Sequence, residues 1–209
     1  MRTNLSSSRQ ESIIQGAIAL IHAQGFPAFS YGDLAKQLSI SKGVLTYHYA
    51  HKLLLTDAVV EYIIADYSRH ILFALDGQQD PVAIMHGYIR AVLTYTFQHP
   101  VYISVLMEVG STARNADGSL RYGSHFRQQA LDGISELLQQ GQAADVFGQC
   151  DIPMTAVLIK GTLDEYVRCR FDASDIMLHG ERHIEQDIDA IIGIIDDLIL
   201  KNKEGIVSR

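Results

Sequence analysis

Residues 29–52 read FSYGDLAKQLSISKGVLTYHYAHK, and two serine residues divide this stretch into two short predicted helices. Ser30 precedes Asp33 by three residues, a spacing in which the serine hydroxyl can accept a hydrogen bond from the first turn of a helix. Ser41 stands in the same position before a second helix that begins at Lys42. The stretch therefore predicts two helices joined by a turn of only a few residues.

Apolar spacing gives each of these helices a buried face. The buried stripe of the first helix is Leu34, Ala35 and Leu38, and the inward residues of the second are Leu45 and Tyr49. Two helices joined by a tight turn have the form of a helix-turn-helix, whose second helix enters the major groove of DNA.

A further helix is expected upstream of this pair. Ser8 and Glu11 have capping-box spacing, and apolar residues continue at helical period to about Gln24, where Gly25 ends the helix. Three short helices thus occupy about the first fifty residues.

The same stretch resembles the DNA-binding signature of TetR-type repressors. The resemblance rests on the run SKGVLTYHY at residues 41–49 and on the lysine three residues after its final aromatic, and it covers about residues 10 to 55. It implies an all-α protein of about nine helices. A three-helix DNA-binding head at residues 1–52 would precede a larger helical body for effector binding and dimerisation at residues 53–209. The implied partners are a double-stranded operator, a small-molecule effector and a second copy of the chain.

Residues at the start of the second motif helix are expected to read bases. Lys42 can donate to guanine, Val44 can touch a thymine methyl, and Gly43 lets the backbone approach DNA closely. Thr46 shares this face. The resemblance implies phosphate contacts for Ser30, Tyr31, Tyr47 and His48, and the charge of Lys52 adds to the N-terminal dipole of the helix that it begins, which also favours a phosphate. The residues expected to bind DNA are Ser30, Tyr31, Lys42, Gly43, Val44, Thr46, Tyr47, His48 and Lys52.

Three positions depart from the family pattern. Ser39 stands where the family commonly has a glycine, which predicts either a left-handed serine or a slightly altered turn. Val44 replaces a more usual threonine, and Thr46 replaces a more usual tyrosine. These last two departures bear on which operator sequence is read.

Charge is distributed unevenly along the 209 residues. Residues 1–52 carry five Lys and Arg against two Asp and Glu, whereas the remainder carries 12 against 22. A basic head on an acidic body predicts that the head meets a polyanion. The acidic balance of the body favours a cationic or neutral apolar effector over a polyanionic one.

Proline positions and apolar periodicity predict the helices of the body. The expected helices span residues 52–75, 81–98, 101–112, 124–140, 153–171 and 181–202, and Gly141 is expected to end the fourth of them. In the last helix, apolar residues alternate steps of four and three, the spacing of a seam that packs against another helix. This seam consists of Ile184, Ile188, Ile191, Ile195 and Leu198. We expect the last two helices to pair with their mates in a homodimer.

Aromatic residues and methionines of the body are the candidates for effector contacts. Tyrosines are the most informative, because a buried phenol needs a partner and can orient a ligand in an apolar pocket. The candidates are Tyr62, Met85, Tyr88, Tyr95, Tyr102, Met107, Phe126 and Tyr166. Each of them also fits a plain structural role in the core.

Motifs for catalysis, cofactors and metals are missing from the sequence. It has no GxGxxG, no GxxxxGK[ST] and no G-x-S-x-G run, and Glu181 does not directly follow His179 as an H-E-x-x-H zinc site would require. We therefore expect no enzymatic activity, no cofactor and no metal. The polar N-terminus and the lack of a long apolar span predict a cytoplasmic protein without a membrane segment. The distant Cys150 and Cys169 are expected to be reduced thiols.

Two other classes of function stay open. One is an architectural, nucleoid-type DNA-binding protein without an effector. The other is a helical enzyme or small-molecule-binding protein whose head has lost DNA binding. The sequence leaves open the effector, the operator, the regulated genes and the sign of regulation.

Overall fold

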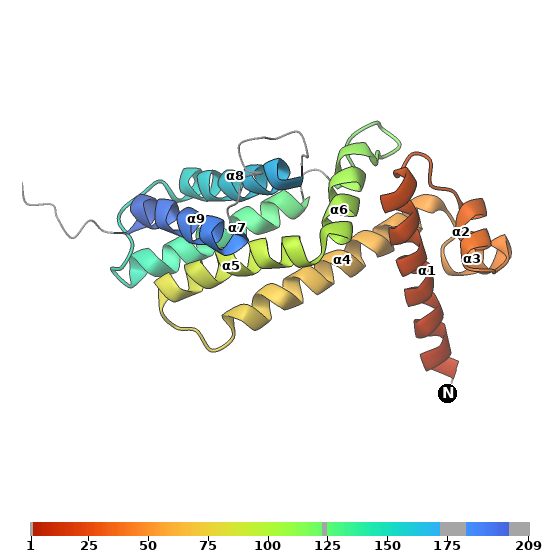
Figure 1. Ribbon diagram of the computed structural model, residues 1–209, viewed down its shortest axis with the longest axis horizontal. Helices are drawn as coiled ribbons and strands as arrows, with labels where there is room; N and C mark the ends of the chain where they lie inside the picture. Colours follow the sequence, from red (N-terminus) through yellow and green to blue (C-terminus); the bar gives the residue numbers. More distant parts are fainter. Residues whose placement is uncertain (1, 123–124, 172–182, 201–209) are drawn as a thin grey trace, which may run out of the picture. The chain divides into compact units, whose positions relative to one another are not determined.

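The computed structural model describes residues 2–122, 125–171 and 183–200, and these residues are helical, with only two isolated β-bridges (Figure 1). The helices within these ranges are α1 (Arg2–Gln24), α2 (Tyr31–Gln37), α3 (Lys42–His48), α4 (Lys52–Leu75), α5 (Pro81–Gln98), α6 (Pro100–Thr112), α7 (His125–Ala143), α8 (Ile152–Phe171) and α9 (Ile184–Ile199). The expected all-α fold is confirmed.

The chain divides into two compact units. The first unit comprises Met1–Arg69 and Gln98–Ser124, so it contains α1 to α3, most of α4 and all of α6. The second unit comprises His70–Phe97 and His125–Arg209 and contains the end of α4 with α5, α7, α8 and α9. The functional boundary predicted near residue 52 lies inside the first unit and stays a prediction.

Both predicted N-caps of the helix pair are confirmed. The Ser30 hydroxyl accepts a hydrogen bond from the backbone N–H of Asp33, and the Ser41 hydroxyl accepts one from the N–H of Val44, at 3.2 and 3.3 Å. These bonds satisfy backbone donors that have no partner within the first turn of a helix, and they fix where α2 and α3 begin.

The turn between α2 and α3 contains a left-handed serine. Ser39 has a φ of 53°, which confirms the first of the two conformations expected there. The N–H of Ile40 donates to the carbonyl of Ala35 at 3.0 Å, the hydrogen bond of a Schellman helix end. A residue with a Cβ is strained in this conformation, which explains why the family commonly has a glycine at this position.

The ends of two helices differ from the sequence-based expectation. Helix α1 begins at Arg2 rather than near Ser8, because serine in a capping-box spacing is also tolerated inside a helix. Helix α7 continues through Gly141 to Ala143. A Cβ at Gly141 would lie 1.9 Å from the ring of Phe147, so this glycine makes room for a buried side chain instead of ending the helix.

The apolar seam of α9 faces the interior of the second unit. Ile188 is fully buried, and Ile191 and Ile195 are buried with it, whereas Ile194 and Leu198 are exposed. The three buried residues pack within their own chain, so they are not free to meet a partner, and the pairing of the last two helices in a homodimer stays a prediction. The predicted ends of this helix at residues 181 and 202 lie outside the described residues.

Candidate nucleic-acid interface

Helix α3 is anchored on one side and exposed on the other. Leu45 is fully buried, while Lys42, Gly43, Thr46 and Tyr47 are exposed, with Tyr47 showing 85% of its surface to solvent. The exposed residues form two neighbouring pairs, 42–43 and 46–47, which lie four residues apart. They therefore share one face of the helix. This face is available to a ligand.

The chemistry of this face varies along it. Lys42 contributes a cation, and Tyr47 contributes an exposed ring whose edge contacts His48 at a centroid distance of 5.2 Å. A Cβ at Gly43 would meet only the Ser41 hydroxyl, at 3.6 Å, so the backbone there is open to close approach. The Thr46 hydroxyl donates to carbonyl oxygens of its own helix and leaves its methyl group for apolar contact.

Two residues expected to contact phosphates are bonded within the chain. The Ser30 hydroxyl donates to the carboxylate of Asp33 at 2.5 Å, in addition to its capping bond. The Tyr31 phenol donates to the backbone carbonyl of Tyr49 at 2.9 Å, and burial, with the neighbouring Tyr49, raises the pKa of Tyr31 to about 12. Tyr31 thereby ties the start of α2 to the end of α3.

Lys52 is also bonded within the chain. Its ammonium donates to the carbonyl oxygen of Phe26 at 2.6 Å and lies 4.3 Å from the centroid of the Phe26 ring. Burial lowers the pKa of Lys52. The lysine at the start of α4 thus points into the turn between α1 and α2.

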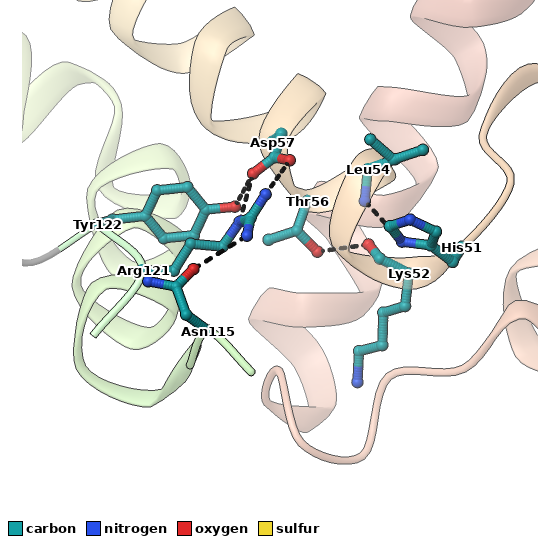
Figure 2. A network of polar contacts seen from close by, with 8 residues as sticks. All are labelled: His51, Lys52, Leu54, Thr56, Asp57, Asn115, Arg121 and Tyr122. Carbon is teal, nitrogen blue, oxygen red and sulfur yellow. Dashed lines mark hydrogen bonds and ion pairs between the residues drawn. The ribbon is translucent and has the colours of Figure 1, made fainter. Parts of the chain in front are cut away.

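A polar network on α4 was not anticipated from the sequence. Asp57 accepts hydrogen bonds from Arg121 Nε and Nη2, at 2.7 and 2.6 Å, and from the Tyr122 phenol at 2.5 Å (Figure 2). Arg121 also donates to the side-chain oxygen of Asn115 at 3.1 Å. Because 64 residues separate Asp57 from Arg121, no local sequence pattern predicts this contact. The network ties the second turn of α4 to the segment that follows α6.

Three polar contacts join α6 to α1 and to the turn after it. Gln15 donates to the Tyr102 hydroxyl at 3.0 Å, and His22 and Ser104 share a hydrogen bond of 2.7 Å. At the other end, the backbone N–H of Phe26 donates to Glu108 at 3.2 Å. All these residues belong to the first unit, so the head is bonded to α6 as well as to α4.

The candidate effector residues fall in both units. Tyr62, Tyr102 and Met107 belong to the first unit, where the rings of Tyr62 and Tyr102 meet edge to face. The remaining candidates are Met85, Tyr88, Tyr95, Phe126 and Tyr166, all in the second unit.

Within the second unit these candidates have distinct surroundings. Met85 and Tyr95 are buried, and the Tyr166 phenol donates to the buried carboxylate of Asp187 at 2.9 Å. Burial, followed by the charge of Asp164, raises the pKa of Tyr88 to about 12. Their role in effector binding stays a prediction.

Neither a metal site nor a membrane span is found in the part of the chain that the structure describes. It contains no group of three His, Cys, Asp or Glu side chains that could hold a metal ion. None of its helices has the length and apolar character needed to cross a bilayer. His179 lies outside the described residues, and His183 is the N-cap of α9 without a side-chain capping bond.

Residues 13–59, which contain the helix pair and its exposed face, match the family model for bacterial regulatory proteins of the tetR family. The DNA-binding head of this chain is therefore of the TetR type. The matched residues cover the second half of α1, both motif helices and the start of α4, and all of them lie in the first unit.

Similarity to known TetR-type proteins extends beyond the head. The nucleoid occlusion factor SlmA of Marinobacter nauticus is 23% identical over 175 residues, which cover 81% of this chain and 89% of that protein. The ketosteroid transcriptional regulator KstR2 of Mycobacterium tuberculosis shares the fold with a TM-score of 0.69 at 19% identity, covering 93% of this chain and 96% of its own.

A further solved structure contains DNA. AibR in complex with isovaleryl coenzyme A and operator DNA has a TM-score of 0.70 at 17% identity, covering 90% of this chain and 97% of its own. At these identities the solved structures show a shared fold, and together with the family match at residues 13–59 they support a DNA-binding transcriptional regulator.

Proposed function

We propose that this chain is a homodimeric, ligand-responsive repressor of the TetR family that acts in the cytoplasm. It binds a near-palindromic operator and is released by a small-molecule effector. The observation that carries the proposal is the exposed face of α3, on which Lys42, Gly43, Thr46 and Tyr47 lie together while Leu45 anchors the helix. Lysine, a bare backbone, a methyl group and an aromatic ring supply the contacts that a major groove accepts.

Geometry favours a dimer for this task. A helix of seven residues offers few contacts, whereas two copies about 34 Å apart can read successive major grooves of a palindrome. The last two helices provide a surface for pairing, because large apolar side chains on both are exposed. These side chains are Met154, Val157 and Leu158 on α8, and Ile194 and Leu198 on α9. Large exposed apolar side chains are typical of interfaces between protein chains where they gather in one patch.

Effector and operator are coupled in this proposal through α4. This helix begins directly after the DNA head and runs for 24 residues from the first unit into the second. An effector that favours a different placement of the heads lowers operator affinity, and by linkage the operator lowers effector affinity by the same factor. The AibR complex with an acyl coenzyme A makes that ligand class the first to screen, alongside cationic and neutral apolar compounds.

A direct test is a fluorescence anisotropy titration with the DNA that flanks the gene for this chain. The measurement is made at two salt concentrations and with random DNA as competitor. Tight, competitor-resistant binding that weakens with salt is the expected result. If binding is no tighter than to random DNA, selection from a random library decides between a distant operator and a head that does not read sequence.

Two variants assign the binding to α3. Tyr47→Ala and Lys42→Gln are expected to weaken operator binding at least tenfold, because each removes an exposed group of the reading face. Arg69→Gln removes one charge from α4, outside the head, and is the matched control for Lys42→Gln. Equal losses in Lys42→Gln and Arg69→Gln would contradict the assignment.

A second candidate function is DNA binding without an effector, and the similarity to a nucleoid occlusion factor favours it. The two candidates differ in their response to ligands. A repressor is expected to melt at a higher temperature with its effector and to release the operator, whereas an architectural protein shows neither effect. Tight ligand binding or catalytic turnover in a protein without any DNA affinity would instead favour a head that has lost its function.

A further inference from the structure

The backbone of Phe26 is held from two sides. This residue lies in the turn between α1 and α2, and its N–H donates to the carboxylate of Glu108 on α6 at 3.2 Å. Its carbonyl oxygen accepts a hydrogen bond from the ammonium of Lys52 on α4 at 2.6 Å. The backbone groups of a single residue thus connect α6 and α4 to the turn that leads into the DNA-reading helices.

The Lys52 ammonium lies against this turn. It lies 3.4 Å from the carbonyl oxygen of Pro27, 4.3 Å from the centroid of the Phe26 ring and 5.4 Å from that of Phe29. Both rings are largely buried, with 8% of Phe26 and 2% of Phe29 exposed. A cation between carbonyl oxygens and aromatic faces is stabilised where it lies. Both carbonyl oxygens that the ammonium contacts belong to the turn, so these hydrogen bonds tie the start of α4 to the head.

Lys52 and Asp57 leave the first turns of α4 in different directions (Figure 2). Asp57 bonds to Arg121 and Tyr122 beyond α6, whereas Lys52 extends into the turn after α1. The same two turns of α4 are therefore fixed both to the segment after α6 and to the head.

We propose that Lys52 positions the DNA head instead of contacting phosphate, and that Lys52 and Glu108 act together by holding the peptide groups of Phe26. The proposal rests on the DNA-binding function proposed above and changes the role that the sequence predicts for Lys52. It makes the turn after α1 a junction at which α4 and α6 set the direction of α2 and α3.

The salt dependence of DNA binding separates a positioning residue from a phosphate contact. Each phosphate contact contributes about 0.9 to the slope of log K against log salt concentration, so a variant that loses one contact has a correspondingly smaller slope. Lys52→Gln is expected to lower affinity at least tenfold with the slope of the wild type. Lys42→Gln removes an exposed cation from the reading face of the same head and is the matched control. A cation held in the groove also displaces counterions from the DNA, so its loss is expected to reduce the slope by up to about 0.9.

Removing the Glu108 side chain tests whether this residue acts only through its charge or by holding the Phe26 N–H, because the two roles predict opposite changes in DNA affinity. If charge alone matters, Glu108→Ala removes a negative side chain and strengthens binding to the DNA polyanion. If Glu108 holds the Phe26 N–H, Glu108→Ala weakens binding. Glu108→Gln, which keeps a side-chain carbonyl acceptor, is then expected to recover most of the affinity.

Thermal unfolding measures the junction without DNA. Lys52→Gln and Glu108→Ala are each expected to lower the unfolding temperature, and the double variant to lower it by less than the sum of the two, because both act on one turn. Additive losses would contradict the joint action. If Lys52→Gln does not fold, the DNA affinities of Glu108→Ala and Glu108→Gln test the proposal instead.

The proposal is overturned if Lys52→Gln keeps the unfolding temperature of the wild type and loses about 0.9 of the salt slope. Tighter DNA binding by Glu108→Ala would overturn the part of it that concerns Glu108. A wild-type protein without preference over random DNA would refute the proposed function instead. The unfolding measurements and the slope on random DNA would still test Lys52 and Glu108 in that case.

Discussion

Asp57 on α4 and Arg121 in the segment after α6 form a two-point ion pair, with Arg121 Nε and Nη2 at 2.7 and 2.6 Å from the two carboxylate oxygens (Figure 2). Both side chains are more than half buried, and the Tyr122 phenol adds a third hydrogen bond to the same carboxylate. Asp57 lies five residues after the start of α4, about one and a half helical turns from the DNA head. The ion pair thus fixes the part of α4 nearest the head.

Asp57→Asn is expected to destabilise the protein by about 1 to 3 kcal/mol, because a charged acceptor of three hydrogen bonds becomes a neutral amide. Urea unfolding followed by circular dichroism measures the change. Asp66→Asn is the matched control, since Asp66 lies on the same helix and pairs with the exposed Arg69. The control is expected to change stability by less than about 1 kcal/mol. Equal effects in the two variants would show that the ion pair contributes no more than a surface pair.

The stability contributed by Asp57 is expected to depend on pH. Burial alone would raise the pKa of Asp57, but hydrogen bonds from Arg121 and Tyr122 and the charge of Arg121 lower it overall. A carboxyl group with a lowered pKa in the folded state stabilises above its unfolded pKa of about 4, and this contribution disappears as pH falls through the folded value. The difference in unfolding free energy between wild type and Asp57→Asn should therefore be constant near neutral pH and shrink below about pH 4. A difference that grows with acidity would contradict this assignment.

Ser39→Gly is expected to stabilise the protein. Ser39 is exposed and has a φ of 53°, a conformation that costs about 1 kcal/mol or more for a residue with a Cβ. Glycine adopts it without strain but loses more backbone freedom on folding, so the net gain should be about 0.5 to 1 kcal/mol. Ser39→Ala keeps the Cβ and is expected to leave the unfolding temperature nearly unchanged. A lower unfolding temperature for Ser39→Gly would show that the turn is not strained.

Two glycines of α7 should respond to alanine with opposite signs. A Cβ at Gly141 would overlap the buried ring of Phe147, whereas a Cβ at Gly133 meets nothing within 4 Å. Gly141→Ala is therefore expected to cost at least about 2 kcal/mol, and Gly133→Ala to stabilise the helix by about 1 kcal/mol. Thermal unfolding compares the two, and Phe147→Leu should recover part of the loss at Gly141. Equal effects of the two substitutions would mean that α7 ends before Gly141 in solution.

Local signals predicted the head well, because they act within a few residues. The serine caps at positions 30 and 41, the left-handed conformation at Ser39 and the start of α4 at Lys52 each depend on neighbours in sequence. The exposed face of α3 follows from the same short-range periodicity. The role of Gly141 was misjudged because its cause, the ring of Phe147, lies outside the helix that the pattern describes.

Contacts between distant segments could not be predicted in this way. The carboxylate of Asp57 meets Arg121, and the N–H of Phe26 meets Glu108, across 64 and 82 residues. Lys52 shows the limit most clearly: its position in the motif predicts a phosphate contact, which stays a prediction, but does not predict the hydrogen bond from its ammonium to the carbonyl oxygen of Phe26. A single sequence does not record which tertiary partner a long side chain finds. Similarly, the spacing of the α9 seam predicted an apolar face but not whether the same chain or a partner would cover it.

The proposed homodimer is expected to depend on the exposed apolar residues of α9. Ile194→Asp and Leu198→Asp place charges at positions with 62% and 45% exposure, so each chain should still fold while pairing is lost. Ile188→Asp and Ile195→Asp do not test pairing, because these side chains are buried within their own chain.

Leu72→Asp makes the same change at an exposed apolar residue of α4 and is the control. Light scattering of the Ile194→Asp, Leu198→Asp double variant should give the mass of one chain, about 23 kDa, against twice that value for the wild type and the control. A double variant that remains dimeric would place the interface elsewhere, and its operator affinity should then be unchanged.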